Sequence, residues 1–263
     1  MSAVFFLYAL LGFPAGYSAA TMYKKLNGTQ RRSTVVAGTA LLLPGILFLM
    51  FLGTDLALWY SNSTGAVPLG TFFIVALLWF GVTVPLVFFG ASRGFKAEEV
   101  TWPSKTNAIP RHIPPKSWFF TLPTLSLIGG GVTFAVAFVQ IFYVFSRMWL
   151  HEFVYMFGFI FITLCLWVIS SAEVAVVATY LTLCLEDHRW WWKAVIVPSS
   201  FGLYMFVMSI VYFLSIMPSG ITTMLFVTYS FMTSLVLSTI AGAVGLEVSL
   251  QFVRKIYSEV KVD

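Results

Sequence analysis

The chain has 263 residues, of which 59% are hydrophobic and only 10% are charged, and its mean hydropathy is +0.91. This composition excludes an ordinary soluble domain, in which about 25% of residues are charged. The net charge of +5 suits loops that face anionic lipid. The sequence offers no basic stripe of the kind that binds nucleic acid, so nucleic acid is excluded as a partner.

Seven apolar runs follow one another along the chain, and each exceeds the roughly 20 residues that cross a bilayer. They cover residues 1–22, 34–60, 67–92, 120–146, 150–184, 194–217 and 221–254. Lipid offers no partner for an unpaired backbone amide, so the runs are predicted to be helices. A β-barrel is excluded because its strands alternate apolar and polar residues. The expected fold is all-α, a single polytopic membrane domain over residues 1–263 with about seven transmembrane helices, embedded in the lipid bilayer.

Fourteen of the fifteen Lys and Arg residues lie in alternate gaps between the runs, and only Arg147 lies in the others. The basic gaps include a loop at 93–117 and a tail at 255–263. Basic loops stay on the cytoplasmic side, so the N-terminus is predicted to be lumenal and the C-terminus cytoplasmic. No cleavable signal peptide is visible. The predicted lumenal loop after the second run carries a possible glycosylation site at Asn62.

Prolines interrupt the first three runs, at Pro14, Pro44 and Pro85. Proline removes a backbone donor, so kinks with close helix packing are expected. The alternative is a broken-helix site of the kind that transporters use. The last run, at about 1.5 Å per residue, is longer than one bilayer crossing and must tilt or protrude.

Acidic residues inside the runs are candidate functional groups, because a charge in hydrocarbon is costly. Glu173 lies deep in the fifth run, where a proton-relay or ion-site role and a structural hydrogen bond are both open. Glu247 has Gln251 one turn away and favours an interfacial polar network. Asp55 lies near the end of the second run and is expected to reach the interface.

The sequence argues against an enzyme. It contains no HExxH, GxSxG or P-loop motif, and its three histidines fall in or beside loops on both sides of the membrane. Cys165 and Cys184 lie on one predicted helix and cannot meet. No catalytic residue, metal site or cofactor is therefore expected.

Several long segments agree in order and spacing with one family. They are GFPAGYSAATMYKKLNG (12–28), VPLGTFFIVALLWFGVTVPLVFFG (67–90), TNAIPRHIPPKSW (106–118), WLHEFVYMFGF (149–159), LCLEDHRWWWK (183–193) and FVRKIYSEVKVD (252–263). Over essentially its whole length, the chain resembles the nonaspanins, or transmembrane 9 superfamily. The family has a large lumenal domain followed by nine spans, and this chain resembles the last seven spans without the lumenal domain.

The resemblance implies a role in the Golgi and endosomes, in the sorting and surface localisation of other transmembrane proteins with glycine-rich spans. It also implies that Lys261 and Asp263 form a C-terminal signal read by the coatomer coat. Glycines beside the prolines, Gly12, Gly16 and Gly45, are predicted to pack against client helices. The alternative function is a secondary transporter or channel that uses the proline-broken helices and Glu173.

Overall fold

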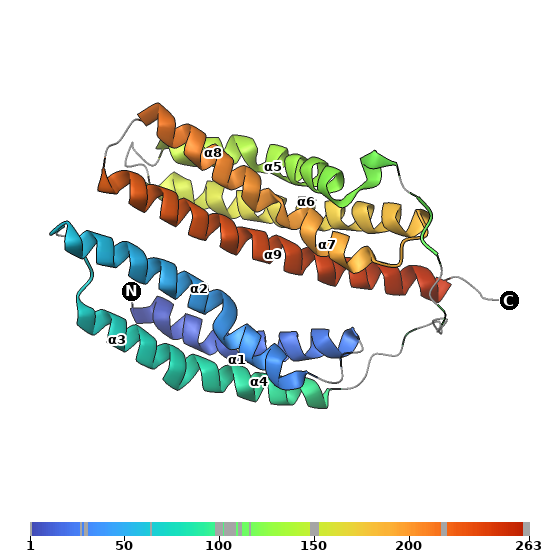
Figure 1. The fold of residues 1–263 in the computed structure, drawn as a ribbon, viewed down its shortest axis with the longest axis horizontal. Coiled ribbons are helices and arrows are strands. Elements are labelled where there is room, and N and C mark those ends of the chain that lie inside the picture. Colours follow the sequence, from blue (N-terminus) through green and yellow to red (C-terminus); the bar gives the residue numbers. More distant parts are fainter. Residues whose placement is uncertain are drawn as a thin grey trace. The chain divides into compact units, whose positions relative to one another are not determined.

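The computed structural model describes residues 2–26, 28, 31–63, 65–97, 102, 109, 112–115, 117–147, 153–216 and 220–259. These residues form helices and no strand, which confirms the predicted all-α fold (Figure 1). The elements are α1 (Ser2–Lys25), α2 (Arg32–Tyr60), α3 (Leu69–Leu78), the π-helix η1 (Trp79–Thr83), α4 (Val84–Lys96), the 3-10 helix η2 (Trp118–Phe120), α5 (Leu122–Arg147), α6 (Phe153–Cys184), α7 (Trp190–Ser199), α8 (Phe201–Ile216) and α9 (Ile221–Glu259).

Six helical stretches of the described residues are long and apolar enough to cross a membrane. They are Arg32–Tyr60, Leu69–Lys96, Leu122–Val139, Phe157–Cys184, Trp190–Leu214 and Ile221–Glu259. Each coincides with a predicted apolar run, and α1 coincides with the first run. The sixth run begins at Trp190 rather than at residue 194, and the last continues as helix to Glu259 rather than to residue 254. The predicted polytopic helical membrane protein is confirmed.

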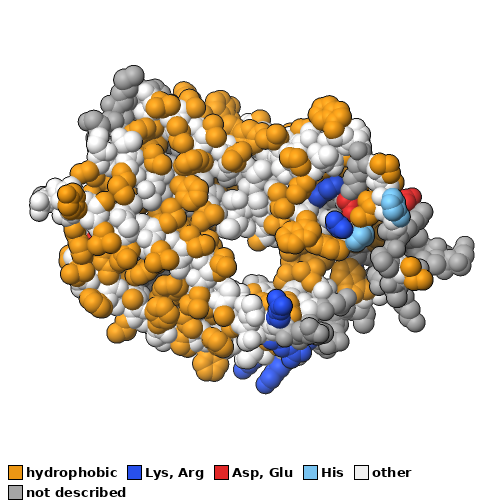
Figure 2. Space-filling model, viewed as in Figure 1, with side chains coloured by type: hydrophobic (Ala, Val, Ile, Leu, Met, Phe, Trp, Pro, Cys, Tyr) orange, Lys and Arg blue, Asp and Glu red, His pale blue; other side chains and the backbone are white. Residues whose placement is uncertain are grey.

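Large apolar side chains point outward from these helices. Leu49 in α2 is 66% exposed, Leu77 in α3 is 70% exposed and Phe161 in α6 is 69% exposed. Figure 2 shows hydrophobic side chains along the visible face of the helices. Soluble proteins rarely expose apolar surface on this scale, so these faces are suited to contact with lipid or with other membrane helices.

The chain divides into two compact units, residues 1–101 and residues 102–263. The first holds α1 to α4, and the second holds η2 to α9. The single membrane domain expected from the sequence stays a prediction.

Two GxxxG pairs bring α1 and α4 together in the first unit. The four glycines are Gly12, Gly16, Gly90 and Gly94. An added Cβ on Gly16 would overlap the carbonyl oxygen of Val87, and one on Gly90 would overlap the carbonyl oxygen of Phe13. The helices run parallel, because residue numbers rise together from the contact of Gly12 with Thr83 to that of Gly16 with Val87. Small residues allow this close approach, which maximises van der Waals contact in a solvent that gives no hydrophobic drive.

The π-helix η1 places a donor against a carbonyl that proline leaves free. Pro44 has no N–H, so the carbonyl of Ala40, four residues earlier, loses its helical partner. The indole Nε1–H of Trp79 donates to that carbonyl at 3.1 Å, and the Trp79 side chain is buried. Pro85 follows η1, in which Val84 N–H bonds to the carbonyl of Trp79, five residues back. The predicted close packing around Pro44 and Pro85 therefore takes the form of a π-turn and a tryptophan cap.

Replacing Trp79 by phenylalanine is expected to destabilise the first unit by about 1–3 kcal/mol, because the Ala40 carbonyl stays buried without its donor. The measurement is the thermal midpoint of the purified protein in detergent micelles. Trp192→Phe is the matched control, since the Trp192 side chain is 60% exposed. An equal midpoint for both variants would contradict the assigned role of the indole.

Lys24 closes the basic end of the first unit. Its Nζ donates to the carbonyl of Phe95 at 3.3 Å and to that of Ala97, beyond the last turn of α4. The Arg32 guanidinium lies over the Phe95 ring, 5.4 Å from its centroid. Cations are favoured at a helix C-terminus, where the last carbonyls lack intrahelical donors. The basic residues at the end of α1 and the start of α2 thus gather with the end of α4.

The second unit is held by small residues and hydroxyl groups. Gly130 of α5 closely approaches Ser200, and Gly202 of α8 closely approaches Ser234 of α9. Hydroxyl bonds cross between helices from Thr179 Oγ1 to Ser249 Oγ at 2.9 Å, from Ser238 Oγ to the Ser199 carbonyl at 2.8 Å, from Ser200 Oγ to the Ser126 carbonyl at 2.6 Å and from Tyr204 OH to the Leu127 carbonyl at 2.7 Å. Such bonds between helices add specificity where apolar contact alone cannot distinguish one neighbour from another.

The break between α7 and α8 was not predicted from the sequence. Pro198 lies inside α7, and the span changes from α7 to α8 at Ser200. Pro198 frees the carbonyl of Ala194, and Gly245 lets the backbone of α9 approach that carbonyl closely. The freed carbonyl therefore faces α9 across a close helix contact.

Candidate functional site

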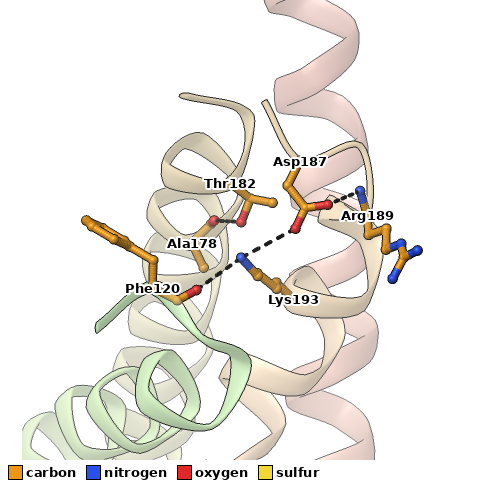
Figure 3. A network of polar contacts seen from close by, with 6 residues as sticks. All are labelled: Phe120, Ala178, Thr182, Asp187, Arg189 and Lys193. Carbon is orange, nitrogen blue, oxygen red and sulfur yellow. Dashed lines mark hydrogen bonds and ion pairs between the residues drawn. The ribbon is translucent and has the colours of Figure 1, made fainter. Parts of the chain in front are cut away.

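A buried ion pair links the turn after α6 to α7 in the second unit, and its lysine also bonds to η2 (Figure 3). Asp187 Oδ2 lies 3.8 Å from Lys193 Nζ, and both side chains are at most 7% exposed. Asp187 Oδ1 accepts the backbone N–H of Arg189 at 3.0 Å, and Lys193 Nζ donates to the carbonyl of Phe120 at 3.4 Å. The pair fixes the turn after α6 against the start of α5.

The turn that presents Asp187 follows from the end of α6. Glu186 takes a left-handed conformation, with φ of 56°, and Asp187 N–H bonds back to the carbonyl of Thr182 at 3.1 Å. This geometry ends the helix and turns the Asp187 carboxylate toward α7. Lys193 is one of the loop cations that predict the orientation of the chain, whereas Asp187 was not predicted to have a role. The sequence signal for this pair is an aspartate three residues before a helix start and six before a lysine.

A second polar site closes the link between α2 and α3. Asp55 Oδ1 accepts the N–H of Val67 at 2.8 Å, and Trp59 Nε1 donates to the carbonyl of Val67 at 3.0 Å. Asp55 is buried, at 3% exposed, against the link between the two helices. Its place at the membrane interface stays a prediction. Both backbone groups of Val67 are held by side chains of α2, which fixes where α3 begins.

Asn62 lies in the turn just after α2. It is exposed and left-handed, with φ of 52°. A short polar side chain such as that of asparagine tolerates this conformation. Glycosylation of Asn62 stays a prediction.

Glu173 lies on the exposed face of α6, one turn after Ser170, whose buried hydroxyl donates to the carbonyl of Trp167. Ser171 is buried on the other side of the helix. Glu247 is half-buried in α9, and its Oε1 accepts a hydrogen bond from Gln251 Nε2 at 3.3 Å. Among the contacts that the structure describes, none joins Glu173 to Glu247. Among the described residues, no group of three or more His, Cys, Asp or Glu side chains is placed to hold a metal ion.

The predicted client-packing glycines separate into two kinds. Gly12 and Gly16 are buried inside the first unit, where α4 occupies the surface that was expected to receive a client helix. A client cannot pack on these two glycines while α4 lies against them, so for them the expectation is corrected. Gly45 is half-buried, and an added Cβ there would meet only the ring of Trp79, at 3.5 Å. Lys261 and Asp263 lie outside the described residues.

Comparison with known proteins gives consistent matches along the chain. A family model described as Endomembrane protein 70 matches residues 1–222. Over 100% of its length the chain is 37% identical to Transmembrane 9 superfamily member 10 of Arabidopsis thaliana, covering 41% of that protein. It is 38% identical to Transmembrane 9 superfamily member 2 of Rattus norvegicus and 37% identical to that of Homo sapiens, covering 40% of each. The chain thus spans about two fifths of the length of these relatives. No solved structure matches it significantly.

Proposed function

Because the chain belongs to the transmembrane 9 superfamily, we propose that it is a non-enzymatic membrane trafficking factor that assists the sorting and surface localisation of other transmembrane proteins. The observation that carries this proposal is the match to relatives of that superfamily along the entire chain. A polytopic helical bundle suits a protein that recognises other membrane helices.

A row of glycines on α2 supports the recognition of client helices. Gly38, Gly45 and Gly53 are spaced by seven and eight residues, which places them on one face of a helix. An added Cβ would meet nothing within 4 Å at Gly38 or Gly53. Such a row lets a glycine-rich client span approach the backbone of α2 closely, in the way that α1 approaches α4.

The proposed location is the membranes of the Golgi and endosomes, with the N-terminus lumenal and the C-terminus cytoplasmic. The word endomembrane in the family description favours internal membranes. Lys24 and Arg32 lie together with the end of α4 at one end of the first unit. This arrangement supports the proposal that the basic segments face the same side of the membrane. In this proposal Lys261 and Asp263 bind the coatomer coat by electrostatic contact.

Surface proteomics in cells depleted of the protein tests the proposal. A set of multi-pass membrane proteins is expected to fall at the surface and to recover with the wild-type protein but not with Gly38→Leu/Gly53→Leu, whose added side chains block the α2 row. Lys261→Ser is expected to move the protein out of the Golgi, because it removes the cation of the tail signal.

Two results would contradict the proposal. One is a surface proteome that does not change on depletion. The other is solute flux through the purified protein in liposomes that Glu173→Gln abolishes, since flux of that kind would support a transporter. The thermal midpoint of each variant checks that it still folds.

A further inference from the structure

One face of α6 carries a continuous outward row of large side chains. The row consists of Ile162, Leu166, Ile169, Glu173, Val177 and Tyr180. The five members other than Glu173 are 37–56% exposed, and Glu173 is exposed as well. Spacings of three and four residues keep such a row on one side of a helix, as in a helix–helix seam.

The opposite face of α6 is already used inside the second unit. Trp167, Ser171, Ala175 and Thr179 are buried there, and Thr179 bonds to Ser249 of α9. Thr182 is buried on that face as well. The outward row is therefore a separate surface, with no part in the core of this unit.

Glu173 lies well inside α6, far from both ends of the helix. It precedes the last residue of the helix, Cys184, by eleven positions, or about 16 Å, and it follows the first, Phe153, by twenty, or about 30 Å. Charged or polar groups at such depth usually pair with a partner, because hydrocarbon offers no hydrogen bond. One turn to each side, Ile169 and Val177 are apolar, and the nearby Ser170 hydroxyl donates to the carbonyl of Trp167.

The apolar side chains and the carboxyl group of the row together indicate which kind of partner can bind it. A second copy of the chain packed in parallel through the same face would oppose two Glu173 carboxyl groups, which attract each other only if at least one is protonated, whereas a cation pairs with the ionised carboxylate. A lipid chain supplies no donor. A membrane helix with a lysine or arginine at the depth of Glu173 supplies both the apolar contact and the donor.

We propose that the outward face of α6 binds a single transmembrane helix that carries a basic side chain near mid-bilayer, and that Glu173 pairs with that side chain. This inference rests on the proposed recognition of client spans and names a client chemistry for a surface other than the α2 glycine row. The row supplies affinity through apolar contact, and Glu173 supplies selectivity for the basic residue.

Binding of designed single-span peptides to the full chain in phosphatidylcholine nanodiscs tests the proposal. The probes are a Leu/Ala helix with one central lysine, the same helix with leucine there, and a third with the lysine moved two turns along. The central-lysine peptide is expected to bind roughly 5–30-fold tighter than the leucine peptide, the range that model-peptide hydrogen bonds between membrane helices provide. Fluorescence transfer from labelled peptide gives the affinities.

Two variants separate charge from packing. Glu173→Leu is expected to abolish the preference for lysine, and Ile169→Ala is expected to weaken both peptides equally while leaving their ratio unchanged. Both positions are exposed, so both variants should keep the wild-type thermal midpoint.

Three outcomes would overturn the proposal. They are a lysine preference that survives in Glu173→Leu, equal binding of the peptide with the displaced lysine, and self-association of the chain that Glu173→Leu removes, which would assign the face to a second copy. The nanodisc assay contains no cell and no sorting step. A positive result there with an unchanged surface proteome would therefore refute the trafficking role and leave the binding site standing.

Discussion

Replacing Gly16 by alanine is expected to lower the stability of the first unit by about 1–3 kcal/mol, the usual cost of forcing extra carbon into a packed interface. The added Cβ would overlap the carbonyl oxygen of Val87, which is backbone and cannot move aside as a flexible side chain could. Gly90→Ala should act in the same way, because its Cβ would overlap the carbonyl of Phe13. The thermal midpoint in detergent micelles measures both.

Gly38→Ala is the matched control for these variants. It makes the same chemical change in a neighbouring helix, but its Cβ would meet nothing within 4 Å. Alanine favours helix over glycine by up to about 1 kcal/mol, so this control should hold or raise the midpoint. If Gly16→Ala and Gly38→Ala moved the midpoint in the same direction and by the same amount, the close approach of α1 to α4 would not be a source of stability.

Breaking the buried ion pair is expected to have the largest effect in the second unit. Lys193→Met leaves Asp187 buried without the cation that lies 3.8 Å away, and Asp187→Asn leaves Lys193 without its carboxylate. Removing one partner of a buried pair costs about 3–5 kcal/mol, whereas removing both often costs much less. The double variant should therefore be more stable than the sum of the single changes predicts, and a double-mutant cycle on the thermal midpoint measures the difference.

Arg189→Met controls for the loss of a positive charge at the same turn. The Arg189 side chain is exposed, and its backbone N–H, which donates to Asp187, is kept in the variant, so the change should alter stability by less than about 0.5 kcal/mol. Additive effects of Lys193→Met and Asp187→Asn would show that the two charges do not stabilise each other.

The spans could be predicted from the sequence because hydropathy is a property of each stretch by itself. The seven runs match α1 through α9, and the positions of Pro44 and Pro85 correctly marked places of unusual packing. The partner of the Ala40 carbonyl could not be predicted in this way. It depends on Trp79, in another span, and on a π-turn whose hydrogen bonds no hydrophobic period reveals.

The candidate site was less accessible to prediction, because it depends on which face of a helix meets a neighbour. Gly12 and Gly16 were correctly read as packing residues, yet their partner is α4 of the same chain. Glu173 was singled out for its depth, but the sequence could not show that it points away from the core of its unit. Asp187 was missed because a loop acid beside several cations looks solvated until the fold buries it.

The π-turn at residues 79–83 also changes the rotational phase of its span. In an uninterrupted helix, the eleven steps from Trp79 to Gly90 would add up to three turns and about 20°, so both residues would face the same neighbour. An extra residue in one turn offsets everything beyond it by about 100°. This offset lets the rings of Phe72 and Trp79 contact Phe48 of α2 while Gly90 meets α1. A single span thereby serves two neighbours with its two halves, and the length of that one turn sets the angle between them.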